Sequence, residues 1–165
     1  MRTIKFKGKR IDNGEWVAGD LAHSLDGRLN ILGFNIKDGV TNFSGAYLIG
    51  PKTVCQFTGF LDKNGKEIYE GDVLRSNEYP YSCLENDERD NYYAVVYYCE
   101  ERSCFGIVTA KNPDSDVRGI SDGIPGDVER ENMKRFEVVG NIHDKEWKQY
   151  GEYFQTKEET EAEDD

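Results

Sequence analysis

The residues most capable of chemistry lie within one short stretch, residues 58–76, which mixes acidic, basic and turn-forming side chains. Paired carboxylates serve as general acids and bases, and their oxygens are the ligands that Mg²⁺ and Ca²⁺ prefer. The charged side chains between Thr58 and Val73 are Asp62, Lys63, Lys66, Glu67, Glu70 and Asp72. Together they define a candidate carboxylate site for acid–base catalysis or for a divalent cation.

Backbone geometry offers a second explanation of the same stretch. Asn64-Gly65 predicts a two-residue hairpin turn of type I′, which requires positive φ at both central residues. Asp62 and Asp72 are suited to accept hydrogen bonds from backbone amides in turns. In a calcium loop of the EF-hand type a Glu follows six residues after the Gly, and here Gly71 stands at that position. We therefore interpret the stretch as structural and predict no catalytic, cofactor-binding or metal-binding residues.

The remaining reactive side chains show no catalytic spacing. None of the cysteines forms a Cys-x-x-Cys pair, and both histidines are remote from them in sequence, which gives little support to a zinc site. Covalent catalysis by Cys or Ser also needs an adjacent base, and no Gly-rich phosphate loop is present. His143 beside Asp144 is more typical of hydrogen bonding at a chain end. We expect a protein that is not an enzyme and has no cofactor. The side chains considered are Cys55, Cys83, Cys99, Cys104, His23 and His143.

Aromatic side chains raise the alternative of a stacking surface. Tyr69 and Trp16 could stack on a ligand, although packing in the core or between sheets is the favoured interpretation. The run Tyr92–Cys99 contains two tyrosine pairs that point to both faces of one strand. Aromatic side chains on a β surface can stack single-stranded bases. Because the chain is acidic, we instead predict a sheet core on one face of this strand and a protein interface on the other.

The charge of the chain restricts its partners. The net charge is −11, and the last eleven residues hold six acids and one Lys. Because phosphate contacts need clustered Lys and Arg, an extended grip on nucleic acid is disfavoured. Lys5, Lys7, Lys9 and Arg10 leave a local basic patch open, but we interpret them as the solvent face of a strand. No apolar run approaches the roughly 20 residues of a membrane span, and the first residues lack the apolar region of a signal peptide. We expect a cytoplasmic protein with no membrane contact.

Hydrophobic alternation and turn residues predict a mainly β protein with one or two short helices near the C-terminus. Strands are expected at residues 4–9, 15–21, 28–36, 47–49, 53–57, 92–99, 104–108 and 136–142. Helices are expected over 127–135, capped by Asp127, and over 145–154, while 77–91 and 111–126 read as loops. The predicted organisation is an N-terminal β unit (1–57), a hairpin motif and connection (58–76), a C-terminal β region (77–150) and an acidic, disordered tail (151–165).

Three blocks of the sequence resemble the YopX family, whose members occur mainly in bacteriophages and prophages. The central block, Thr53–Val73, carries the resemblance most specifically, and Ile4–Leu21 and Phe136–Asp144 extend it. Two departures stand out. Cys55 occupies a position where the family commonly has Gly, and residues 145–147 replace its usual Asn-Pro-Glu-Leu closing. The resemblance implies an N-terminal antiparallel sheet packed on a C-terminal SH3-like barrel or roll, and it supplies no catalytic residues.

The functional expectation is a phage or prophage accessory protein in the cytoplasm of a bacterial host. It would act without catalysis, by binding a host or phage protein or by forming a homo-oligomer. Two alternatives stay open. One is an acidic decoy that mimics DNA toward a host DNA-binding protein, motivated by the net charge. The other is a small metal-dependent hydrolase that uses the carboxylates of residues 58–76.

Overall fold

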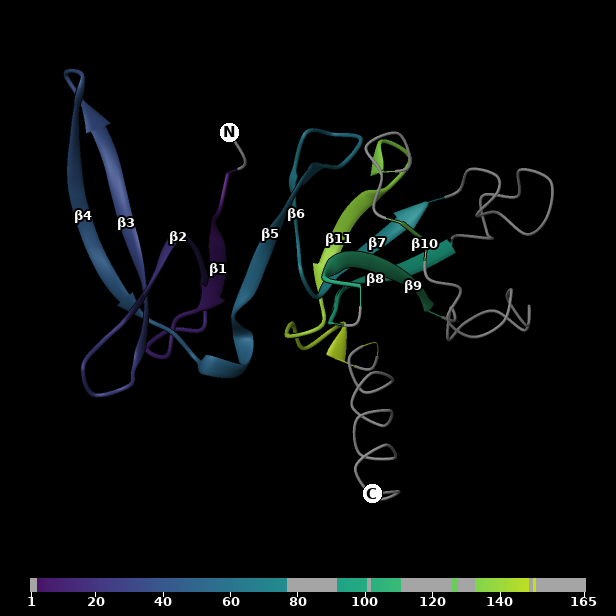
Figure 1. Ribbon diagram of the computed structural model, residues 1–165, viewed down its shortest axis with the longest axis horizontal. Helices are drawn as coiled ribbons and strands as arrows, with labels where there is room; N and C mark the ends of the chain where they lie inside the picture. The colour runs from purple at the N-terminus through teal and green to yellow at the C-terminus, as the bar shows by residue number, and fades with distance from the viewer. Residues whose placement is uncertain are drawn as a thin grey trace. The chain divides into compact units, whose positions relative to one another are not determined.

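The computed structural model describes residues 3–76, 92–100, 102–110, 126–127, 133–148 and 150. The chain divides into two compact units, residues 1–59 and 60–165, which we describe separately (Figure 1). The described part is mainly β, as predicted, and its strands form one six-stranded and one five-stranded sheet. The predicted loop at 77–91, nearly all of the one at 111–126, and the predicted tail from 151 lie outside the described residues.

The first unit is built from antiparallel strands around a small core. Its elements are β1 (Phe6–Lys9), β2 (Trp16–His23), β3 (Leu29–Lys37), β4 (Val40–Leu48), the short 3₁₀ helix η1 (Pro51–Thr53) and the start of β5 (Cys55–Leu61). The predicted first hairpin is confirmed, because Phe6 pairs with Gly19 and Lys9 with Trp16. Ile31 and Ile49 are fully buried. Ile4 is 64% exposed, however, and in β1 Phe6 is half-buried like Lys7 and Lys9, so the predicted alternation does not separate a buried face from a solvent face.

Strand β4 is longer than the sequence predicts. The sequence predicts an extended chain here only at residues 47–49, whereas β4 covers nine residues and pairs with β3 along its length. The two strands are joined by Asp38-Gly39, whose φ angles are +53° and +76°. Positive φ at both central residues is the property of a type I′ turn, which Asp-Gly favours. The β3–β4 hairpin therefore has a local sequence signal at its tip.

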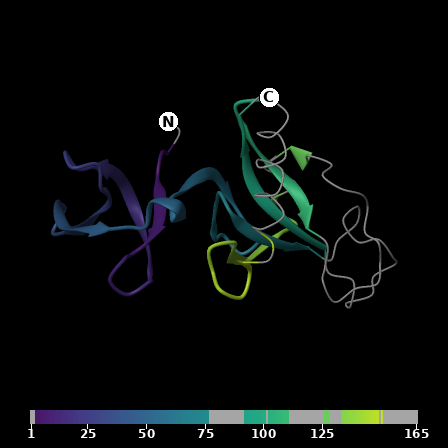
Figure 2. The same cartoon turned by 90° about the horizontal axis from the view of Figure 1, so that it is seen from below.

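The second unit contains the five-stranded sheet and the end of the first one. Its strands are β6 (Glu67–Tyr69), β7 (Asp72–Ser76), β8 (Tyr92–Cys99), β9 (Cys104–Ala110), β10 (Gly126–Asp127) and β11 (Glu137–Asn141). Strand β8 lies between β7 and β9, as predicted for the most β-prone run (Figure 2). Within the described residues this sheet is open, with β10 and β11 at its edges. The SH3-like barrel that the family resemblance implies is thus not confirmed.

Both faces of β8 are buried, which corrects one prediction. Ala94 and Val96 belong to one apolar cluster, and Val95 belongs to a second cluster with Tyr150. On this second face the Tyr93 ring lies 5.9 Å from the Trp147 ring and 6.0 Å from that of Tyr150. The chain's own C-terminal segment therefore covers this second face, and the centre of β8 leaves neither face open for the predicted protein interface.

The two predicted helices are not confirmed. Asp127, the expected helix cap, belongs to β10 and pairs with Gly106 of β9. Residues 128–132 lie outside the described part, and Met133 has helical backbone. Of the second predicted helix, Lys148 and Tyr150 are helical, and the residues beyond are not described. The turn before them is closed by the Trp147 amide, which donates to the carbonyl oxygen of Asp144 at 3.0 Å.

Candidate functional site

The turn between β5 and β6 differs in type from the predicted one. The Gly65 amide donates to the Asp62 carbonyl oxygen at 3.0 Å, and the Asp62 amide donates to that of Lys66 at 2.8 Å. Gly65 has φ +79°, but Asn64 is not among the residues with positive φ. This is a three-residue loop with a bulge at Gly65, not a two-residue type I′ turn. The Asp62 side chain explains the difference, because it accepts hydrogen bonds from the Asn64 and Lys66 amides, both at 2.8 Å.

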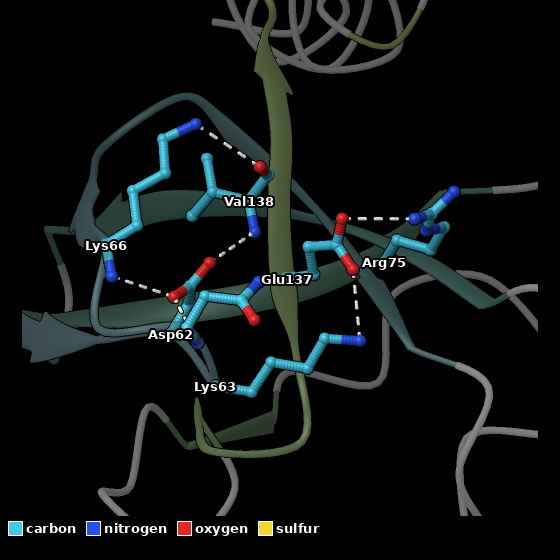
Figure 3. Close-up of polar contacts among 7 residues, drawn as sticks. Asp62, Lys63, Lys66, Arg75, Glu137 and Val138 are labelled. Carbon is cyan, nitrogen blue, oxygen red and sulfur yellow. Dashed lines mark hydrogen bonds and ion pairs between the residues drawn. The ribbon is translucent and has the colours of Figure 1, made fainter.

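Asp62 also connects this turn to β11, the edge strand of the five-stranded sheet. Its second carboxylate oxygen accepts a hydrogen bond from the Val138 amide at 3.0 Å (Figure 3). Lys66 strengthens the junction, since its Nζ donates to the Val138 carbonyl oxygen at 3.3 Å. Asp62 is only 4% exposed. Three backbone amides therefore share a buried carboxylate, which is the arrangement of a structural cross-link.

Asp72 is a second buried carboxylate, and it links the turn before β7 to the other end of β11. It is fully buried, and its two oxygens accept hydrogen bonds from the Tyr69 amide at 2.8 Å and from Asn141 Nδ2 at 3.0 Å. Asn141 Nδ2 also donates to the carbonyl oxygen of Glu70 at 3.2 Å. Gly71 has φ +73°, and a Cβ there would lie 3.2 Å from Asn141 Nδ2. The second turn is therefore held by a buried carboxylate–amide pair around a glycine.

Tyr69 is buried in the second unit and does not offer its ring for stacking on a ligand. Tyr69 is 4% exposed, and its hydroxyl donates to Glu67 Oε2 at 2.7 Å. Burial, and then this hydrogen bond, raise the pKa of Tyr69 above its ordinary value of 10, so the phenol stays protonated at neutral pH. Trp16 is half-buried in the first unit, where Lys7 Nζ and Lys9 Nζ lie 4.7 and 5.3 Å from the centre of its ring. Tyr69 is a core residue, as favoured, whereas Trp16 is flanked by cations.

Glu137, the first residue of β11, belongs to an ion-pair cluster that the sequence analysis missed. Glu137 accepts hydrogen bonds from Lys63 Nζ at 3.0 Å and from Arg75 at 3.1 Å (Figure 3). The hydrogen bond from Lys63, and then the one from Arg75, hold the pKa of Glu137 below its ordinary value. Lys63, from the turn, and Arg75, from β7, thus share one carboxylate of β11. No local pattern links these residues, which lie on three separate elements.

The motif side chains therefore do not converge on one point. Asp62 binds the amide of Val138, Asp72 binds Asn141, and Glu67 binds Tyr69. Within the described residues, no three His, Cys, Asp or Glu side chains are grouped so as to hold a metal ion. The arrangement ties two turns to both ends of a strand, and its chemistry is that of backbone hydrogen bonding. Asn141 was missed as a partner, although the family resemblance at Phe136–Asp144 marks its segment.

The described cysteines and His143 lie on separate segments of the structure. Cys55 is buried in β5, and its Sγ donates to the Thr53 carbonyl oxygen at 3.4 Å. A side chain is tolerated there because Cys55 is not among the residues with positive φ. Cys99 and Cys104 are register partners at the closed end of the β8–β9 hairpin. The His143 amide donates to Asn141 Oδ1 at 3.0 Å. Cys83 lies outside the described residues.

Comparison with known proteins identifies the family. The model of the YopX protein family matches residues 5–146, most of the chain, and the chain belongs to this family. Among solved structures, the crystal structure of protein EF1440 from Enterococcus faecalis is similar, with a TM-score of 0.46 and 19% sequence identity. That match covers 87% of this chain and 95% of the other. No curated protein matches the sequence. No helix in the described ranges has the length and apolar character needed to cross a membrane.

Proposed function

We propose that this chain is a non-enzymatic protein-binding module, an accessory protein of phage or prophage origin. The observation that supports this most is the use of Asp62 and Asp72. Both are buried, and their oxygens accept hydrogen bonds from backbone amides and from Asn141. A catalytic carboxylate needs access to substrate, and these two are committed to the fold. The family membership supplies no reaction that would argue otherwise.

A direct test captures partners on the tagged, folded chain from a lysate of the bacterial host. The proposal predicts either a protein recovered in stoichiometric amount or a stable oligomer of the chain itself. If neither a partner protein nor an oligomer is found, with the chain shown to be folded by circular dichroism, the proposal is contradicted. Glu70→Gln and Asp72→Asn test the hydrolase alternative in the same preparation. On our proposal Asp72→Asn lowers stability, whereas loss of a measurable hydrolytic activity without loss of stability would support the enzyme.

The acidic decoy is a second candidate, and the charge distribution favours it. Residues 1–59 carry eight basic and five acidic side chains, a net charge of +3. Residues 60–165 carry 13 basic and 27 acidic side chains, a net charge of −14. The net negative charge of the chain thus comes from the second unit. A partner held by this charge should be released in 1 M salt, because exposed charges are then screened within about 3 Å; retention in 1 M salt would exclude the decoy.

A further inference from the structure

The β3–β4 hairpin ends the sheet of the first unit with an open strand. Within the described residues β4 pairs on one side only, with β3. Its sequence, Val40–Leu48, contains no charged residue and no Pro. Natural edge strands are usually protected from other strands by such residues. A shift in register follows Gly33, and the Leu48 carbonyl oxygen already accepts a hydrogen bond from Ile11. The regular and open part of the edge is therefore Val40–Phe43.

Large apolar side chains gather at the same end of the hairpin. Phe34, Val40 and Phe43 are 50%, 59% and 61% exposed. Phe34 and Phe43 are register partners, and their rings meet edge to face with centroids 5.7 Å apart. Figure 1 shows β3 and β4 continuing together past the ends of the strands beside them in this unit. Exposed aromatic side chains beside an open strand are typical of a protein interface.

The charges indicate which partner this edge can accept. Two copies of a chain with a net charge of −11 repel each other over most of their surface. The hairpin 29–48 contains only two charged residues, Lys37 and Asp38, which are adjacent and opposite in sign. It belongs to the unit with a net charge of +3. The hairpin itself, with one charge of each sign, therefore adds little charge repulsion between two copies that meet at this edge.

Symmetry supplies the second reason. A strand that pairs antiparallel with its own copy forms a two-fold interface, so one surface is complementary to itself. We propose that two copies of this chain associate through antiparallel pairing of Val40–Phe43, with Phe34 and Phe43 of each copy packed across the two-fold axis. This inference rests on the proposed function, since self-association is one form of protein binding. It names the partner as a second copy and the surface as the edge of β4.

Two variants test the edge by different means. Phe43→Lys places a charge in the interface, yet it lowers the net charge of each copy from −11 to −10, so general repulsion decreases. Thr41→Pro removes a single amide. Because Lys37 and Val40 close the two-residue turn as a hydrogen-bonded pair, strand alternation directs the Thr41 amide away from β3. Proline at this outward position should leave the β3–β4 ladder intact.

The experiment is sedimentation velocity of the full chain over a range of concentrations. The wild type should shift from 18.9 kDa to twice that mass as concentration rises. Both variants should stay at the monomer mass, with unchanged circular dichroism. Leu25→Lys is the matched control, because it makes the same charge change in the same unit at a side chain that is 111% exposed, and it should dimerise like the wild type.

The outcomes separate this inference from the proposed function. A wild type that stays monomeric at about 0.2 mM overturns the inference. Its dimer dissociation constant would then lie above roughly 0.2 mM, which is too weak for a specific dimer. The proposed function then still stands or falls by capture of another protein. If Phe43→Lys abolishes such capture from a monomeric wild type, the edge serves a different protein and the second copy is excluded. A dimer that both variants leave intact places the interface elsewhere and also overturns the inference.

Discussion

Removal of the Asp62 carboxylate is the sharpest perturbation of this fold. The two turn amides that it binds belong to Asn64 and Lys66, which are exposed and can turn to water in its absence. The Val138 amide cannot, since that residue is 7% exposed. A buried unsatisfied donor costs about 1–3 kcal/mol, and a hydrogen bond to a charged group contributes about 1.5–3 kcal/mol. We therefore expect Asp62→Ala to lower the free energy of unfolding by about 3–4 kcal/mol.

Asp62→Asn separates the contribution of the turn amides from that of the Val138 amide. The amide oxygen can still accept from the turn, but the NH₂ group then faces the Val138 amide, donor against donor. The expected loss is about 2–3 kcal/mol, most of the alanine value. If the carboxylate served only the local turn, Asn would be nearly as good as Asp, because Asn is equally favoured in such turns.

The assay is urea unfolding followed by tryptophan fluorescence. The chain has two tryptophans, Trp16 in the first unit and Trp147 in the second. A Trp16→Phe background therefore reports the unit that contains Asp62. Glu100→Gln, an exposed loss of the same charge in the same unit, is the control and should change stability by less than about 0.5 kcal/mol. An Asp62→Asn variant as stable as this control would refute the cross-link.

Two smaller effects follow from β11. Gly140→Ala would place a Cβ 2.2 Å from Trp147 Cδ1, so the ring must move, and we expect a loss of about 1–3 kcal/mol with red-shifted fluorescence; unchanged emission would contradict this packing. The pKa of Glu137 is lowered from its ordinary value of 4.5, chiefly by the hydrogen bond from Lys63. The stability that its ion pairs contribute is therefore fully present above pH 4.5 and is lost as the pH falls through the lowered pKa. Glu137→Gln should therefore cost under about 1 kcal/mol at pH 7, because the partners are partly exposed, and the difference from the wild type in urea unfolding should vanish at low pH; a difference that persists there would exclude this explanation.

The strands that could be predicted are those with strong local signals. Tyr92–Cys99 is a run without charge or breaker in which tyrosines and valines predominate, and β8 has these same bounds. The first hairpin follows from the alternation around Phe6 and the turn before Trp16. β4 was largely missed because Asn42, Ser44 and Gly45 have low strand propensity. Its signal was present in Asp38-Gly39, the dipeptide of a type I′ turn.

The roles of the motif residues were predictable only in part. Their use in turns follows from residue type, since Asp and Gly favour such geometry. Their distant partners do not follow, because Val138 lies 76 residues beyond Asp62 and Asn141 lies 69 residues beyond Asp72. The predicted turn type at Asn64-Gly65 was wrong for a related reason. The dipeptide alone favours type I′, but the preceding Asp binds two amides and selects the longer loop.

The central claim is that backbone hydrogen bonds, and not a ligand, occupy the aspartates of residues 58–76. The most direct measurement is NMR of the ¹³C-labelled side-chain carboxylates of Asp62 and Asp72 during titration with Mg²⁺ and Ca²⁺. We predict that neither signal shows a saturable shift, and that the Val138 amide stays protected from hydrogen exchange throughout. A saturable shift of both carboxylates, with loss of protection at Val138, would contradict the claim and identify a cation site.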